Sequence, residues 1–230
     1  MPRADAAFWH NHRRILDCTG FFKRGTGHLN DPYEGQKATS LISALESKAF
    51  LSTVDQLIAA GRTGSKADNK SLLRKFLLAD LWGNQGDLAL APLDNGNAHV
   101  ALSISQDDSH SNLLQDESQA AIDHITSSTP GRIDIVLDNS GIELLCDLVL
   151  ADFLLSHKLA TQVHLHVKGE PLFISDSMTK DVVTHISALA HHEDPNIQVR
   201  IADFFSTQRP RFHAFFNCFV LHSHDVDVYS

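Results

Sequence analysis

Residues 132–158 read Arg-Ile-Asp-Ile-Val-Leu-Asp-Asn-Ser-Gly-Ile-Glu-Leu-Leu-Cys-Asp-Leu-Val-Leu-Ala-Asp-Phe-Leu-Leu-Ser-His-Lys, and their apolar spacing changes at the pair Asp138 and Asn139. Before this pair, the β-branched run at 133–137 is typical of a buried strand. After it, apolar residues from Ile142 onward recur at helical spacing. We therefore expect Asp138 and Asn139 at the carboxyl end of a strand, the edge of an open α/β sheet at which ligands bind.

The rest of the chain extends this junction into an α/β fold. The spacing of apolar residues predicts strands at 99–103, 133–137, 163–167 and 197–201, and helices at 115–125, 142–157 and 179–191. Because crossovers between parallel strands are right-handed, we expect one parallel sheet in a Rossmann-like α/β/α core. Helical spacing also dominates the chain before this core. The predicted regions are a helical N-terminal segment at 1–88, an α/β metal-binding core at 89–205 and a divergent C-terminal tail at 206–230.

Composition narrows the class of protein. A chain of 230 residues with 43% hydrophobic content can bury a sizeable core. The net charge of −9 and the scattered basic residues argue against a nucleic-acid partner. Three cysteines without a Cys-x-x-Cys pair predict no disulfide framework, and we find no signal peptide or membrane span in the sequence. We expect a cytoplasmic protein without nucleic-acid or membrane partners, whose oligomeric state the sequence leaves open.

The residues at the predicted strand end are hard oxygen donors. An Asp carboxylate and an Asn carbonyl suit Mg²⁺ or Mn²⁺ rather than a metal that prefers sulfur. A third oxygen ligand should come from another strand end, and the nearest candidate is Asp176, which closes the apolar run 171–175 before the next predicted helix. Each residue also has a structural explanation, since Asp-Asn is common in turns and Asp176 is placed like a helix cap. The pattern favours a divalent-cation site and leaves those explanations open.

Histidines are abundant, but their spacing does not favour a zinc site. The 15 histidines include three close pairs, His164-x-His166, His191-His192 and His222-x-His224. Zinc sites need three or four converging ligands with supporting partners, whereas these pairs belong to separate elements. We interpret most of them as strand and surface histidines. The sequence also contains no Gly-x-Ser-x-Gly, P-loop or Gly-x-Gly-x-x-Gly motif, which argues against the enzyme classes built on them.

Three motifs occur in one order: Leu-Trp-Gly-Asn-Gln-Gly-Asp-Leu at 81–88, Ile-Asp-Ile-Val-Leu-Asp-Asn-Ser-Gly-Ile-Glu-Leu at 133–144 and Phe-Ile-Ser-Asp at 173–176. Together they resemble the DUF89 damage-control phosphatases, in the branch that contains sugar-phosphate phosphatases and the animal acidic-residue methyltransferase. The resemblance runs from about residue 31 to about residue 205. It implies a divalent cation, Mn²⁺, Mg²⁺, Co²⁺ or Ni²⁺, held by Asp138, Asn139 and Asp176.

The resemblance also implies a function and a substrate site. The implied activity is metal-dependent hydrolysis of small sugar phosphates, with Asp138 catalytic as a nucleophile or only as a ligand. The anionic substrate would contact Asn84, Asp87, Asp138, Asn139 and Glu143. For Glu143 the alternative is a capping box with Ser140, whose Ser-x-x-Glu spacing it has, and for Asn84 and Asp87 the alternative is turn chemistry.

The sequence departs from the family after 203–205. The expected aromatic-rich stretch, a further part of the α/β domain and an Arg-(Thr/Ser/Cys)-x-Lys motif do not follow, and the N-terminal helices of the family are not recognisable. Truncation at both ends is therefore an expectation. Two alternatives to the phosphatase remain: an S-adenosylmethionine-dependent protein-glutamate O-methyltransferase, and a truncated metal-binding fragment without activity.

Overall fold

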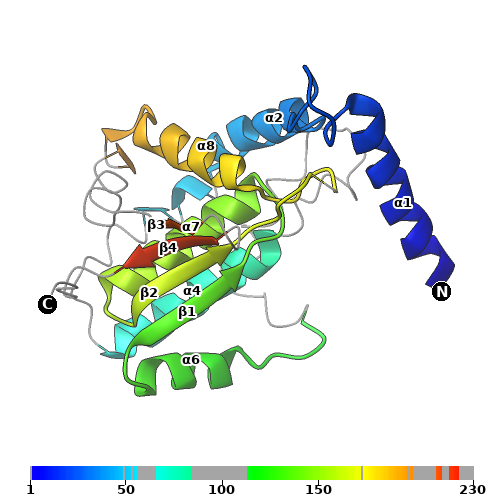
Figure 1. Ribbon diagram of the computed structural model, residues 1–230. Helices are drawn as coiled ribbons and strands as arrows, with labels where there is room; N and C mark the ends of the chain where they lie inside the picture. Colours follow the sequence, from blue (N-terminus) through cyan, green and yellow to red (C-terminus); the bar gives the residue numbers. More distant parts are fainter. Residues whose placement is uncertain are drawn as a thin grey trace, which may run out of the picture.

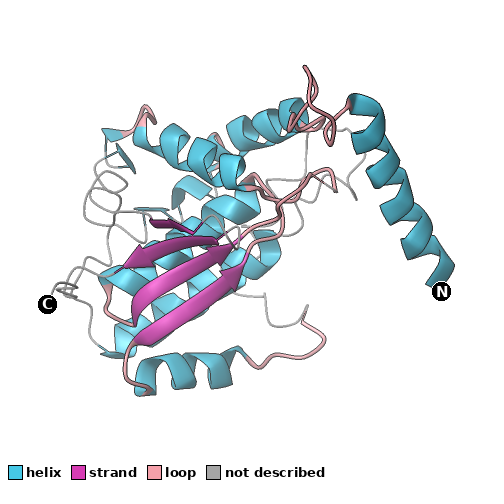
Figure 2. Ribbon diagram, in the orientation of Figure 1, coloured by secondary structure: helices cyan, strands magenta, loops and turns pink. Residues whose placement is uncertain are grey.

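The computed structural model describes residues 2–48, 50–52, 54–55, 66–83, 113–171, 173–195, 197–198, 211–213 and 218–222. They form a mixed α and β structure (Figures 1 and 2). Its helices are α1 (Pro2–Thr19), α2 (Glu34–Leu45), α4 (Lys66–Gly83), α6 (Ser118–Ser127), α7 (Ile142–Ser156) and α8 (Thr179–Ala190). Its strands are β1 (Gly131–Val136), β2 (Ala160–His166), β3 (Arg211–His213) and β4 (Cys218–His222).

The four described strands form one sheet in the order β1-β2-β4-β3. β1 and β2 are parallel and joined by α7, which confirms the predicted strand–helix–strand unit. β4 pairs antiparallel with β2, and β3 antiparallel with β4. Both antiparallel strands come from the region expected to be a divergent tail, so the described sheet is mixed rather than wholly parallel.

Two predicted strands differ from the structure. Ile197 and Gln198 are helical, so the strand predicted at 197–201 is wrong at its first two residues, and 199–201 lie outside the described part. Residues 173–175 are bends rather than the end of a strand. The strand predicted at 99–103 lies outside the described residues. The predicted helices at 115–125, 142–157 and 179–191 correspond to α6, α7 and α8.

The core lies between the sheet and α7, with α4 packed behind α7 (Figure 1). α7 is apolar on nearly its whole circumference because it contacts the sheet on one side and α4 on the other. Phe153 of α7 is fully buried and packs against Phe76 of α4 in a tilted ring contact, with ring centroids 4.9 Å apart. Val163 and Leu165 of β2 are also fully buried. Each such side chain stabilises the fold by about 1.5–3 kcal/mol.

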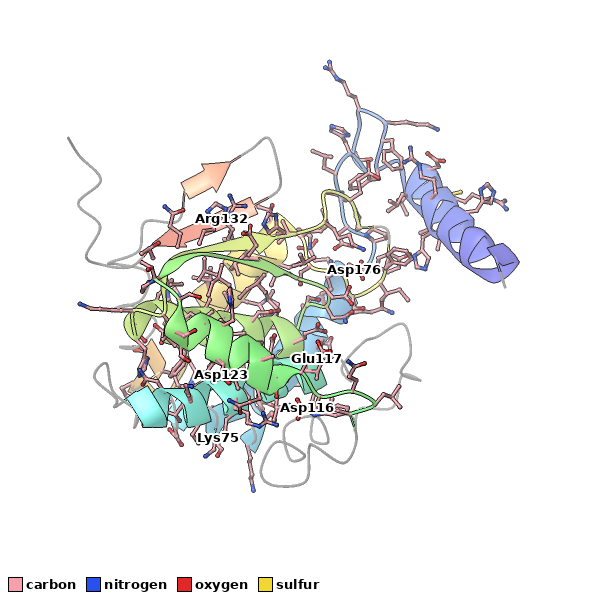
Figure 3. The ribbon with its side chains drawn as sticks, turned by 90° about the horizontal axis from the view of Figure 1, so that it is seen from below. Lys75, Asp116, Glu117, Asp123, Arg132 and Asp176 are labelled. Atoms are coloured by element: carbon pink, nitrogen blue, oxygen red, sulfur yellow. The ribbon has the colours of Figure 1, made fainter. Side chains whose placement is uncertain are left out.

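The opposite face of β1 is open among the described residues: Val136 is 80% exposed, and Arg132 and Asp134 are exposed with it. Figure 3 shows Arg132 on the side of the sheet away from α4 and α6, and Asp176 among the loops beside α2. In the described part of the chain, no helix combines the length and apolarity that crossing a membrane requires.

Candidate functional site

The site is built where the loop after β1 meets the segment before α8. Asn139 and Asp176 form an isolated antiparallel backbone bridge. Two short hydrogen bonds flank it: the Ser140 N–H donates to the Ser175 carbonyl at 2.7 Å, and the Ser177 N–H donates to the Asp138 carbonyl at 2.6 Å. A local backbone pairing therefore brings Asp138, Asn139 and Asp176 together. Asp176 was expected at the end of a strand. In the structure, this single bridge fixes its position beside Asn139 instead.

Asn139 is 1% exposed and its amide is held from both sides. The Nδ2 group donates to Glu143 Oε2 at 2.8 Å, and the Oδ1 atom accepts a hydrogen bond from Ser175 Oγ at 2.6 Å. Because a carbonyl oxygen has two lone pairs, one that accepts a hydrogen bond is still the type of donor that a divalent cation takes. The contact with Glu143 fixes which end of the amide is the oxygen.

Glu143 does not form the capping box considered from the sequence. The residue that precedes α7 as its N-cap is Gly141, and the Glu143 carboxylate turns back to Asn139. Within the described residues, the Ser140 hydroxyl is buried and has no hydrogen-bond partner. The spacing Ser-x-x-Glu is present, but the Glu143 carboxylate accepts a hydrogen bond from the Asn139 side-chain amide, and Ser140 takes no part in a cap.

Asp176 is 5% exposed and surrounded by positive charge. The Lys168 ammonium contacts its carboxylate, and the Lys37 ammonium donates to its backbone carbonyl at 2.6 Å. Sequence reasoning missed both lysines. The signal for Lys168 was its position two residues beyond the end of β2, at the same sheet edge as the Asp-Asn pair.

Lys37 belongs to α2 and is 2% exposed. Its ammonium lies 3.0 Å from Asp31 Oδ2 and 2.8 Å from Asp181 Oδ2. Burial by itself raises the pKa of Asp181, but the ammonium of Lys37, helped by the Met178 N–H and the ammonium of Lys180, outweighs burial and the net pKa is lowered. A buried charge is tolerated only when paired in this way.

A cluster of carboxyl groups lies behind the site, where α4 meets α7. Burial, reinforced by the charges of Asp138 and Asp80, raises the pKa of Glu143 to about 7. Asp80 and Asp147 share a hydrogen bond; burial raises the pKa of Asp80 to about 6 and that of Asp147 well above its usual range. Two carboxyls can share such a bond only when one holds a proton. The site can therefore exchange protons near neutral pH.

The start of α7 is fixed by His185 of α8. The Gly141 N–H donates to His185 Nε2 at 2.8 Å, and His185 Nδ1 donates to the Asp181 carbonyl at 2.7 Å. This pattern requires the neutral imidazole, with its hydrogen on Nδ1. Burial lowers the pKa of His185 to about 4, in agreement with that assignment.

Of the predicted site residues that the structure describes, Asp138, Asn139, Glu143 and Asp176 lie together. Asn84 and Asp87, predicted to contact substrate, lie outside the described residues. Gly83, the last residue of α4, packs so closely on α7 that a Cβ at this position would lie 2.8 Å from the Glu143 Cα. Asp138 is exposed, whereas Asn139 and Asp176 are buried, so Asp138 forms the open side of the group.

These features define an α/β protein whose strand-end site is built from carboxylate and amide oxygens. Residues 5–221 match the domain family described as the damage-control phosphatase ARMT1-like domain, and the chain belongs to this family. This confirms the resemblance given by the three sequence motifs.

Relatives of the chain carry the name damage-control phosphatase ARMT1. The zebrafish (Danio rerio) protein is 31% identical over 179 residues, which cover 74% of this chain and 40% of the relative. The human (Homo sapiens) protein is 32% identical over 173 residues, covering 70% of this chain and 38% of the relative. The rat (Rattus norvegicus) protein is 40% identical over 121 residues, covering 49% of this chain and 28% of the relative. The chain thus spans two fifths or less of the length of these relatives.

Proposed function

We propose that this chain is a metal-dependent phosphomonoester hydrolase acting on small sugar phosphates. The observation that carries the proposal is the bridge between Asn139 and Asp176, which sets a hard-oxygen pair beside Asp138 at the end of β1. The family name and the named relatives support a phosphatase type of activity. The same proposal includes a small sugar phosphate as the substrate and a cytoplasmic location. It also includes a Rossmann-like architecture for the complete sheet.

The residues fit a divalent cation by the chemistry of their donors. Asp138, Asn139 and Asp176 supply two carboxylates and one amide oxygen, the ligand types that Mg²⁺ and Mn²⁺ take. The amide oxygen of Asn139 already points away from Glu143. Lys168 places a positive charge on Asp176, and its side chain is 39% exposed, so it is free to rearrange around a cation and a phosphate. Bound there, the cation would polarise the phosphoryl group and offset its negative charge.

The chain's own residues supply proton transfer and positioning in this proposal. A group with a pKa of about 7 is close to half protonated at neutral pH, which suits Glu143 to give a proton to a leaving alkoxide or take one from water. Lys168 is placed to hold a phosphate oxygen, because its ammonium lies at the same edge as Asp176. Asp138 acts as nucleophile or as cation ligand, and its exposure leaves both roles open to substrate.

Phosphate release from a panel of sugar monophosphates tests this function. We expect the 230-residue chain to be inactive in EDTA and active with Mn²⁺, Mg²⁺ or Co²⁺. Asp176→Asn should lower kcat at least about 100-fold, since it removes a carboxylate ligand of the cation that would polarise the phosphoryl group. Asp123→Asn, which changes an exposed carboxyl on α6, serves as the matched control.

Two outcomes would contradict the proposal. One is no phosphate release above the metal-free sample from any sugar phosphate, with the protein folded by circular dichroism. The other is equal activity in the Asp176→Asn and Asp123→Asn variants. Binding of Mn²⁺ without turnover would instead support the metal-binding fragment considered from the sequence.

A further inference from the structure

A second group of metal-ligand side chains lies on the open face of the sheet. The parallel register pairs Asp134 of β1 with His164 of β2. His166 follows His164 by two residues, so both imidazoles lie on the same face. One ligand atom from each of Asp134, His164 and His166 lies within 4.8 Å of the other two. In the sequence, these histidines lie far from any third ligand. The pairing of β1 with β2 brings Asp134 beside them as that ligand.

Two side-chain contacts orient the imidazoles of this group. His166 Nε2 lies 2.6 Å from Asp134 Oδ1, and His164 Nε2 lies 3.2 Å from Gln162 Oε1. If His164 donates from Nε2, its lone pair is on Nδ1, and Gln162 is then the outer partner that fixes the ring. The three residues project from two strands paired over six positions, a rigid base for a site.

Arg132 is the competitor for Asp134. Its Nε and Nη2 atoms lie 2.8 and 2.5 Å from the two oxygens of that carboxylate. Both side chains of this pair are more than one-third exposed, so separating them costs little. The carboxylate is therefore accessible to another cation.

We propose that Asp134, His164 and His166 form a zinc site on the open face of β1 and β2. Two imidazoles and one carboxylate are the donors that Zn²⁺ accepts, unlike the all-oxygen set beside Asp176. Zn²⁺ holds such atoms at about 2.0–2.2 Å from itself, so rotation of the exposed side chains must bring the three ligand atoms around the ion, and the hydrogen bond between His166 and Asp134 must give way to it. Three protein ligands leave a position for water or for a fourth ligand. The site stands independently of the function proposed above.

Titration of the metal-stripped 230-residue protein with Zn²⁺, in buffer with excess Mg²⁺ to occupy oxygen-donor sites, tests the proposal. We expect His164→Gln and His166→Gln each to weaken Zn²⁺ binding at least about tenfold, the scale seen when partners of metal-bound histidines are removed. His191→Gln, which changes an exposed histidine at the end of α8, should leave the affinity unchanged. Arg132→Gln should strengthen binding roughly two- to fivefold, because it frees Asp134 from a surface ion pair.

Nuclear magnetic resonance of the imidazole nitrogens in the wild-type protein gives a readout that needs no variant. Zn²⁺ should shift the resonances of His164 and His166 at the first equivalent. Equal Zn²⁺ affinity in the His164→Gln, His166→Gln and His191→Gln proteins would overturn the proposal. So would unchanged His164 and His166 resonances at saturating Zn²⁺, since a surface ion-pair group alone predicts that result.

Discussion

The ammonium of Lys37 on α2 donates a hydrogen bond to the backbone carbonyl of Asp176 at 2.6 Å, across 139 positions of sequence. The same ammonium pairs with the carboxylates of Asp31 and Asp181. One buried charge thus holds α2 against the loop that carries Asp176 and against the start of α8. The geometry of the candidate site depends on this contact as well as on the βαβ unit.

Replacing Lys37 with Met should destabilise the protein by about 3–5 kcal/mol, because it leaves Asp31 and Asp181 buried with reduced compensation. Urea denaturation at pH 7 measures the change. The control is Lys180→Met, since Lys180 contacts the same two carboxylates but its side chain is 33% exposed. We expect a loss of no more than about 1 kcal/mol for Lys180→Met. Equal losses in the two variants would contradict the assignment of Lys37 as the central charge.

Replacing Gly141 with Ala should destabilise the protein by roughly 2–3 kcal/mol. Gly141 has φ of 92°, which L side chains rarely adopt, and an added Cβ would press against Ser40 Oγ of α2. Gly35→Ala is the opposite case, because nothing lies within 4 Å of a Cβ there. That substitution in α2 should be neutral or stabilise by about 0.5 kcal/mol. Thermal melts of the two variants should therefore shift in opposite directions or differ by several degrees.

The stability of the protein should depend on His185 below pH 6.5. The folded pKa of about 4 is lower than the unfolded value, so the unfolded chain takes up a proton first as pH falls. Stability that is fully present above pH 6.5 is then lost as pH falls toward 4, by an amount on the order of 3 kcal/mol. His185→Gln keeps an acceptor for Gly141 without titrating. The difference in unfolding free energy between wild type and this variant should change across that window and stay constant above pH 7.

Asp147 should give a pH dependence of the opposite sign. Its pKa and that of Asp80 are raised in the folded state, so the native protein retains a proton that the unfolded chain releases. The resulting stability is present at pH 4 and is lost as pH rises through the folded pKa values. Asp147→Asn should therefore gain stability relative to wild type between pH 5 and pH 8. Asp17→Asn, at an exposed position of α1, is the control; parallel behaviour of the two variants would argue against the shared proton.

Saturating Mn²⁺ should raise the melting temperature of the wild-type protein. A cation at about a hundred times its dissociation constant stabilises by roughly 2.7 kcal/mol, which for a chain of this size is about 5–10 °C. Asn139→Ala should remove this shift, because it deletes the oxygen donor held between Glu143 and Ser175. Differential scanning fluorimetry after EDTA treatment measures it. The same shift in wild type and variant would mean that the cation binds elsewhere.

The β1–α7–β2 unit could be predicted from the sequence because its signals are local. The β-branched run at 133–137 is typical of a strand, and the apolar residues from Ile142 onward recur at helical spacing. Because α7 is apolar on nearly its whole circumference, it has to be buried whatever it packs against. The antiparallel β4 could not be predicted in this way, since a short apolar run states neither its partner nor its direction. The same holds for the contact between Asp134 and His164, which exists only in one register of two strands.

For the candidate site, the Asp-Asn pair and Asp176 were predicted from residue type and position. The lysines beside them, Lys37 and Lys168, were not. Lys37 reads as an ordinary solvent-facing lysine on an amphipathic helix, because sequence carries no sign of the two carboxylates that bury it. For Glu143 the resemblance implied a substrate contact and the spacing offered a capping box as the alternative, and its hydrogen bond with the Asn139 side chain decides against the capping box. The spacing of residues in a sequence does not show which charged side chains pair across a long sequence distance.

The contact between Lys37 and Asp176 also bears on how the chain is made. At about 5–20 residues per second, the 139 residues between them take roughly 7–28 s to synthesise. α2 leaves the ribosome within that interval, before Asp176 and Asp181 have been added to the chain. We therefore expect α2 to dock late in biosynthesis. The contacts around the candidate site are then complete only after the start of α8 has emerged.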